Sequence, residues 1–193
     1  MNSNKILAAA MTTAMTVATA PADSQADDRI DLLDSDLRHW TRLGDANWRS
    51  TDGVVGADSG RGFLVSRETF DNYELKLEFY PGSDSNSGVF MRCADAATIN
   101  DKTCYEANIF DRRPDQSGRT GGIPNYAPPA SVIDTENQWN TYEITADGSH
   151  ITVRLNGVLT VDVRDETLTG GPIALQYAAG SIKFRNVQIR RLP

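Results

Sequence analysis

The stretch YELKLEF, residues 73–79, decides the fold class that we expect. Apolar side chains occupy every second position, so an extended chain would place them on one face: Tyr73, Leu75, Leu77 and Phe79. The residues between them are all charged. This alternation predicts a strand with one face in a core and the other in water.

The same period recurs along the chain. It appears in SGVFMRC (87–93), CYEANIFD (104–111), WNTYEITADG (139–148) and HITVRLNG (150–157). Asn156-Gly157 predicts a type I′ hairpin turn, and a switch of apolar parity predicts a bulge near Asn186. We find no amphipathic helix of ten residues or more after the first 26 residues. Many short strands indicate an all-β sandwich or barrel, and we expect a sandwich of two antiparallel sheets.

The first 26 residues differ from the rest. One lysine, an uncharged stretch of small and apolar residues and the small-x-small sequence Ser24-Gln25-Ala26 are typical of a secretory signal peptide; Ala20 offers an alternative cleavage point. We therefore expect a signal peptide over 1–26, one domain over 27–193, export to the periplasm or beyond, and no stable membrane insertion.

Charge and composition exclude several functions. A net charge of −7 without a basic run argues against nucleic acid as a partner. The chain has only two histidines, so a histidine-rich metal site is excluded, and no glycine-rich phosphate loop is present. We predict no cofactor and no metal, and the oligomeric state stays open.

Two cysteines, Cys93 and Cys104, remain after the predicted cleavage. An even number in an exported chain predicts a disulfide, with two free buried thiols as the alternative. A disulfide would leave catalysis to carboxylates, arginine, lysine, tyrosine and amides.

Polar residues gather on the reverse faces of the predicted strands. Arg92, Glu106, Asn108 and Gln176 each lie opposite an apolar set. They could form a site on the outer face of one sheet. Alternatively, that face could be an ordinary solvent-exposed polar surface, as the outer face of an antiparallel sheet usually is. Nearby, the irregular segment 112–131 is rich in glycine and proline, which indicates a functional or a disordered loop.

An ordered set of motifs resembles one family. The set includes WRSTDGVV (48–55), NSGVFMR (86–92), CYEANIFD (104–111), WNTYEI (139–144), GPIALQ (171–176) and FRNV (184–187). Together they are similar to the bacterial 3-keto-disaccharide hydrolase domain family, from about Leu33 to Leu192. The resemblance implies a concanavalin A-like jelly-roll sandwich and a carbohydrate partner, an oxidised sugar.

The family's polar positions fall on Arg92, Glu106, Asp111 and Gln176 of this sequence. Asp111 shares parity with the core-facing Ile109, so we expect it to cap the strand or hold an arginine. Many members carry Gln at the place of Asn108, and the tyrosine of the following loop, here Tyr126, is displaced. The preferred sugar therefore cannot be inferred from the family.

The activity that the resemblance implies is cleavage of 3-keto-glycosides. A ketone at C3 acidifies the C2 hydrogen, so a base can remove it, the C1 group can leave and water can add. We expect Glu106 to be the base and Arg92 to stabilise the oxyanion. Asn108 and Gln176 would orient hydroxyls, and Tyr126 and Phe90 would contact the sugar.

Two other functions remain open at this stage. The same sandwich could be a non-catalytic carbohydrate-binding module, or it could be an interface that packs against other chains. The enzyme predicts a buried carboxyl with a raised pKa at Glu106, beside Arg92. A binding module predicts an open groove with exposed aromatic residues and no such carboxyl.

Overall fold

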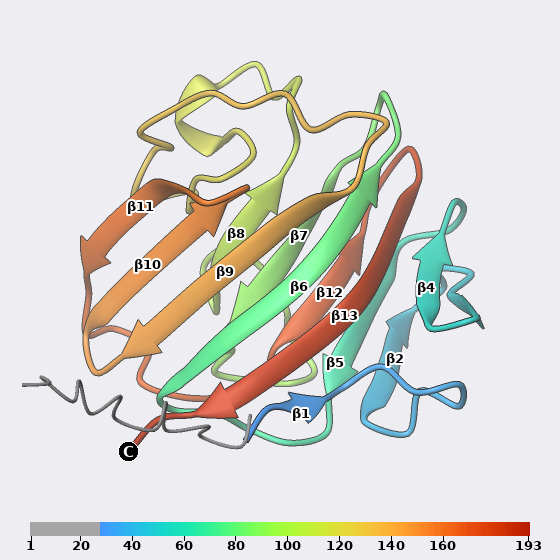
Figure 1. The fold of residues 1–193 in the computed structure, drawn as a ribbon, viewed down its shortest axis with the longest axis horizontal. Coiled ribbons are helices and arrows are strands. Elements are labelled where there is room, and N and C mark those ends of the chain that lie inside the picture. Colours follow the sequence, from blue (N-terminus) through green and yellow to red (C-terminus); the bar gives the residue numbers. More distant parts are fainter. Residues whose placement is uncertain (1–27) are drawn as a thin grey trace, which may run out of the picture.

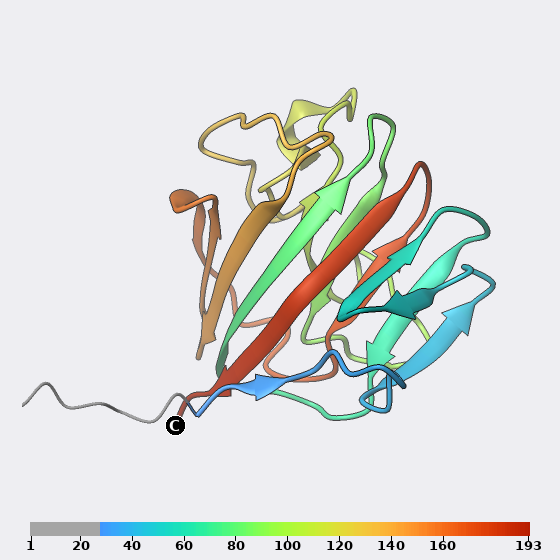
Figure 2. The ribbon, with the colours of Figure 1, turned by 45° about the vertical axis from the view of Figure 1, so that its right-hand side comes forward.

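Two antiparallel sheets packed face to face form the protein, in a computed structural model that describes residues 28–193 (Figure 1). The predicted signal peptide lies outside the described residues and stays a prediction. The view turned by 45° separates the two layers and shows that loops close the sandwich at its ends (Figure 2). No helix in residues 28–193 is long and apolar enough to cross a membrane.

The larger sheet has eight strands. In spatial order they are β11 (Val158–Arg164), β10 (His150–Leu155), β9 (Asn140–Asp147), β6 (Tyr73–Pro81), β13 (Ile182–Arg191), β4 (Val54–Ala57) and β3 (Arg49–Thr51), with β1 (Ile30–Asp31) paired to β13. The smaller sheet has five: β2 (Trp40–Gly44), β5 (Gly62–Ser66), β12 (Ala174–Tyr177), β7 (Ser87–Met91) and β8 (Tyr105–Ile109). The only helix in the described part of the chain is the short 3₁₀ helix η1 (Gln116–Gly118).

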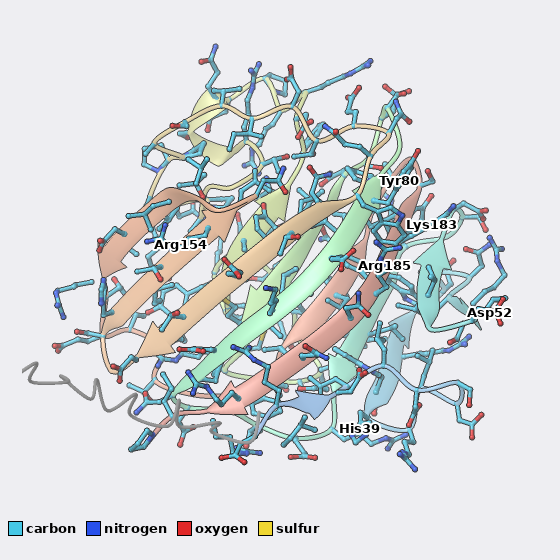
Figure 3. All side chains as sticks on the ribbon, viewed as in Figure 1. His39, Asp52, Tyr80, Arg154, Lys183 and Arg185 are labelled. Carbon is cyan, nitrogen blue, oxygen red and sulfur yellow. A yellow bond between two sulfur atoms is a disulfide. The ribbon has the colours of Figure 1, made fainter. Side chains whose placement is uncertain are left out.

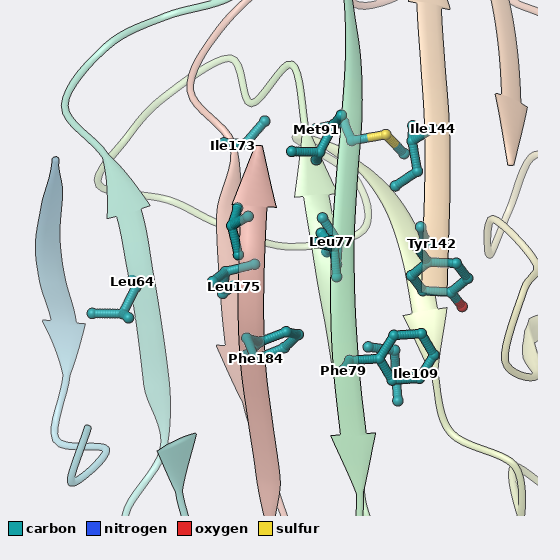
Figure 4. Packing of buried hydrophobic residues seen from close by; sticks show 14 of the residues in the cluster. Leu64, Leu77, Phe79, Met91, Ile109, Tyr142, Ile144, Ile173, Leu175 and Phe184 are labelled. Carbon is teal, nitrogen blue, oxygen red and sulfur yellow. The ribbon is translucent and has the colours of Figure 1, made fainter. Parts of the chain in front are cut away.

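The core fills the space between the sheets, where the alternating apolar residues meet. Leu77 and Phe79 of β6, Ile109 of β8 and Leu175 of β12 are all at most 1% exposed and point toward one another (Figure 4). Burying one such side chain stabilises the fold by about 1.5–3 kcal/mol. The alternation predicted for YELKLEF is thus confirmed.

Two local predictions are also confirmed. Asn156 and Gly157 have φ angles of 51° and 81°, the left-handed values that a type I′ turn requires between β10 and β11. The β13–β6 register shifts between Arg185 and Gln188, and Asn186 has a φ of 51° within that shift. The bulge lets Phe184 and Val187 both face the core despite their odd spacing.

Loops cover the free edge of β8. The backbone N–H of Asn108 donates to the Gly122 carbonyl at 3.0 Å, and the backbone N–H of Gly121 donates to the backbone carbonyl of Asn108 at 3.1 Å. The loop that contains them is ordered, with η1 at its centre. Asp111 accepts hydrogen bonds from Thr120 and from Thr135, so its carboxylate fastens this loop, in line with the capping role expected for it.

A disulfide joins Cys93 to Cys104, as predicted. It closes the loop 94–103 at the ends of β7 and β8. A hydrogen bond of 3.1 Å from Asn125 to the Asp101 carboxylate ties this disulfide loop to the loop that covers β8. Two loops are therefore linked to each other beside the same strand.

Candidate functional site

One row of residues crosses all five strands of the smaller sheet on its outer face, the face turned away from the core. Asn108 of β8 pairs with Gly88 of β7, and Gln176 of β12 pairs with Phe63 of β5, which pairs with Leu43 of β2. Between β12 and β7, Leu175 pairs with Val89, and extending this register by one residue places Gln176 beside Gly88. Gly88 thus leaves a gap in the middle of the row.

The carboxyl group of Glu106 occupies the space above Gly88. Glu106 itself pairs with Phe90, one step along β7, and its side chain leans over the glycine. A Cβ on Gly88 would stand only 3.1 Å from the Glu106 Cδ. Glycine is therefore required here for the carboxyl group to lie where it does.

The Glu106 carboxyl group makes no hydrogen bond or ion pair with any described residue, although only 7% of the residue is exposed. The pKa of Glu106 is raised to about 8, mainly by burial and to a smaller extent by the negative charge of Asp101. The charge of Arg113 acts in the opposite direction and lowers the pKa. A buried carboxyl with an elevated pKa and no partner is typical of a functional group rather than of a wet surface.

Gln176 lies on the other side of Gly88. Its residue is half-buried, and its amide oxygen Oε1 is buried without a hydrogen-bond partner. Buried polar atoms in proteins are nearly always paired, so the unpaired Gln176 Oε1 indicates a place where a ligand would supply the partner. This confirms that Glu106 and Gln176 share the outer face.

The prediction for Arg92 is wrong. Its φ of 49° breaks the strand alternation, and its guanidinium group lies at the end of the sandwich, 1% exposed. There it donates to the carbonyls of Asp71, Gly148 and Leu168 and to the side chain of Asn72. These acceptors occupy the guanidinium, so Arg92 joins chain segments and does not assist Glu106.

The structure places the three residues predicted to contact the sugar against other groups of the protein. Asn108 is 1% exposed, and its amide donates to Gly118 O and accepts from Ile109 N–H, so it anchors the covering loop. Phe90 is also 1% exposed and forms the buried floor under the site. Tyr126 packs edge-on against Tyr105, with 4.7 Å between ring centroids, and the Tyr105 side chain faces the core rather than Glu106.

The structure adds two residues that the sequence analysis missed. Phe63 is half-buried, presents its ring on the outer face beside Gln176 and contacts Phe90 edge-to-face at 5.4 Å. Arg113 is the cation whose charge acts on Glu106, and its guanidinium has no hydrogen-bond partner in the described chain. Its place is set by Gly118, where a Cβ would stand 2.6 Å from Arg113 Nε. Strand parity could have found Phe63, whereas Arg113 depends on the path of a loop.

The outer face of the larger sheet has a hollow that a glycine helps to line. Gly56 of β4 pairs with Lys183 of β13 and with Arg49 of β3. Lys183 in turn pairs with Tyr80, and Figure 3 shows Tyr80, Lys183 and Arg185 together on this face. Arg185 lies over the ring of Trp139, with 4.0 Å to the ring centroid, so Trp139 packs on the surface of this sheet. The hollow measures about 420 Å³.

No group of three or more His, Cys, Asp or Glu side chains that could hold a metal ion occurs in residues 28–193. The site on the smaller sheet thus consists of one carboxyl, one amide, one arginine and an apolar floor.

A family model described as a 3-keto-alpha-glucoside-1,2-lyase-like domain matches residues 28–190. The chain belongs to this family. No curated protein matches the chain.

Solved structures of this family's fold type are numerous. A candidate glycosyl hydrolase from Parabacteroides distasonis ATCC 8503 is 25% identical, with a TM-score of 0.73 over 86% of this chain and 100% of that one. A second protein of the same description and organism is 16% identical, with a TM-score of 0.78 over 91% of this chain and 99% of that one. The carbohydrate-binding module CBM66 from Bacillus subtilis is 18% identical, with a TM-score of 0.64 over 79% and 95%.

These relatives confirm the concanavalin A-like jelly-roll sandwich, a fold shared by lectins and glucanases. Together with the family, they support a carbohydrate-related function. The fold alone does not separate catalysis from binding, so that distinction depends on the site.

Proposed function

We propose that this protein cleaves 3-keto-glycosides and that Glu106 is the base that removes the C2 hydrogen. The observation that carries the proposal is the buried, unpartnered Glu106 carboxyl above Gly88. The family supports the reaction class. Retaining and inverting glycosidases use two carboxyl groups that flank the anomeric carbon, whereas elimination next to a ketone needs a single base.

The chemistry follows from one carboxylate and one cation. Glu106 takes the C2 proton, and the electron pair moves onto the C3 oxygen to give an enediolate. Re-forming the C3 carbonyl makes the C1–C2 double bond and breaks the C1–O bond. The leaving alkoxide takes the proton from Glu106, and water then adds across the double bond. The net reaction is hydrolysis.

The raised pKa suits this role. A base is most effective when its pKa lies near the working pH, and a carboxylate with a pKa of about 8 is a stronger base than an ordinary one. Only the ionised fraction is active, so kcat/KM should rise with pH through about 8 in the free enzyme. We assign to Arg113 the stabilisation of the enediolate, because its guanidinium is unpartnered and its charge is felt at Glu106.

Gln176 would hold a hydroxyl of the sugar, which would donate to the unpaired Oε1. The half-buried Phe63 beside it offers an apolar surface to the sugar ring or to its substituent. The predicted signal peptide and the disulfide support a place of action outside the cytoplasm.

The test is product release from a 3-keto-disaccharide and from the unoxidised parent sugar, with wild type and two variants. We expect wild type to cleave only the keto sugar, and Glu106→Gln to lower kcat by about 10²–10⁴-fold, the range of general-base catalysis. Glu143→Gln is the matched control, because Glu143 lies on the larger sheet and pairs with Lys76 at 3.0 Å. Its rate should equal that of wild type.

Two other outcomes would replace the proposal. Equal cleavage of both sugars would indicate an ordinary glycosidase. Binding of both sugars without cleavage would indicate a binding module, the second candidate, which the similarity to CBM66 favours.

A further inference from the structure

The outer face of the smaller sheet has two chemically different halves. Around β8 and β12 it carries the polar groups of the proposed site: Glu106, Arg113 and Gln176. Around β5 and β2 it is apolar, with Phe63, Leu43 and the tip of the disulfide loop. The proposed reaction uses only the first half.

The two halves form one continuous surface. The row that contains Gly88 and Gln176 continues into Phe63 and then Leu43 without a break. Neighbouring strands are about 4.8 Å apart, so Phe63 is about 10 Å from Gly88 along the row, and Leu43 is about 14 Å away. A group attached to C1 of a sugar seated above Gly88 would therefore extend over the apolar half.

This half contains a hollow of about 430 Å³. Leu43 and Phe63 line it from the sheet, and Ala97, Thr98 and Ile99 line it from the disulfide loop. Gly44 and Gly62, which pair with each other in the β2–β5 register, and Arg61 complete the lining. The disulfide fixes the loop, since Cys93, Cys104 and Ile99 pack in one cluster with Phe90.

The lining indicates what the hollow can hold. It contains no carboxylate and no amide side chain, the acceptors that bind sugar hydroxyls. The Thr98 hydroxyl donates to Asp95 at 2.9 Å, and Arg61 is the one charged residue in the lining. A second sugar ring placed here would have Arg61 as its one charged hydrogen-bonding partner and would leave most of its hydroxyls unpaired, whereas an aryl or alkyl group would have none to satisfy.

We propose that this hollow is the leaving-group subsite and that it takes an apolar aglycone, aryl or alkyl, of a 3-keto-glycoside. The inference rests on the proposed function and adds its substrate class. The polar half recognises the keto sugar, and the apolar half distinguishes one leaving group from another.

The experiment compares two substrates whose leaving alcohols have similar acidity and differ by one aromatic ring. These are the ethyl and the 2-phenylethyl 3-keto-glucosides. With wild type we expect kcat/KM for the phenylethyl substrate to exceed that for the ethyl substrate by about 10–200-fold, the discrimination that an apolar pocket provides. Phe63→Ala should lower this ratio about tenfold.

Leu43→Asn is a second variant, placed at the half-buried rim, so that the test survives if Phe63→Ala does not fold. It should also lower the ratio. Val158→Ala is the control, because Val158 is 44% exposed on β11 of the other sheet, and it should leave the ratio at its wild-type value.

A ratio near one in wild type, or a ratio that neither variant changes, would overturn the subsite while the proposed function stands. Absence of cleavage of either keto-glycoside would instead overturn the proposed function, and the subsite with it.

Discussion

The outer faces of the two sheets carry similar residues in different electrostatic states. On the larger sheet the carboxylates are paired: Glu78 bonds to Arg185 and Asn186 at 2.7 Å, and Asp58 bonds to Arg49 at 2.6 Å. On the smaller sheet Glu106 has no partner and is nearly buried. Each face also has a glycine at this place: Gly56 helps to line the hollow on the larger sheet, and the Glu106 carboxyl covers Gly88 on the smaller sheet.

The difference shows which polar residues of a sheet form a site. The period of two places Glu78 and Glu106 on outer faces equally well. The pairing of Glu78 lowers its pKa against the effect of burial, whereas burial without a partner raises the pKa of Glu106. A missing partner therefore distinguishes the site, and polarity alone does not.

The largest effect should come from adding a methyl group at each of these two glycines. In Gly88→Ala the new Cβ would displace the Glu106 carboxyl, the flexible end of a side chain, so we expect activity to fall about 100-fold with little loss of stability. In Gly56→Ala the Cβ would stand 2.9 Å from the Ile182 carbonyl, which is backbone. That variant should lose about 1–3 kcal/mol of stability and keep its activity. Rates on a 3-keto-disaccharide and urea unfolding measure both effects, and equal loss of activity in both variants would break the comparison.

The next effect concerns pH and stability. The folded pKa of Glu106 is about 8, above the ordinary value of 4.5, so the folded state holds its proton more tightly than the unfolded chain. The stabilisation is full below about pH 4.5 and is lost as pH rises toward 8. The free energy of unfolding of Glu106→Gln, relative to that of wild type, should therefore increase by about 2–4 kcal/mol between pH 5 and pH 9.

Glu78→Gln should show the opposite trend: its free energy of unfolding relative to wild type should decrease as pH rises. The reason is that the pKa of Glu78 is lowered, so the stabilisation that Glu78 gives to wild type is lost as pH falls. Urea titrations at the two pH values give both differences. The same pH trend in the two variants would contradict the contrast between a paired and an unpaired carboxyl.

A smaller effect is expected from Asp101→Asn. The charge of Asp101 raises the pKa of Glu106 less than burial does, so its removal should lower the midpoint of the pH–rate profile by less than about one unit. An unchanged midpoint would mean that burial alone sets the pKa. Asp95→Asn, on the same disulfide loop, is the control, because the charge of Asp95 does not contribute to the shift in the pKa of Glu106.

The smallest effect should come from Trp139→Ala on the larger sheet. The ring is half-buried and stacks under Arg185, so its loss should cost about 1 kcal/mol of stability. Activity should not change, since the proposed reaction uses only residues on the outer face of the smaller sheet. A loss of activity in this variant would require a role for that face.

Sequence patterns predicted the fold well because burial imposes them directly. The period of two in residues 73–79, the Asn156-Gly157 turn and the parity switch near Asn186 each reflect a local rule of strand geometry, and all three are confirmed. They placed Glu106 and Gln176 on one face for the same reason.

The rest of the site depends on features that alternation does not contain. The prediction for Arg92 was wrong because a single left-handed φ turns its side chain toward the end of the sandwich. The role predicted for Asn108 did not take account of the Gly118 carbonyl, ten residues later in an irregular loop, to which its side-chain amide donates a hydrogen bond. Arg113 was missed because its position depends on that loop's path.

The loop over β8 has a further consequence, for the sheet edge itself. A strand at the end of a sheet exposes unpaired backbone groups that can capture a strand from another chain, the first step of aggregation. Gly121 and Gly122 take up the hydrogen bonds of Asn108 at that edge. The strand that carries Glu106 thus has backbone partners on both sides, and the loop that shapes the site also protects the protein from edge-to-edge assembly there.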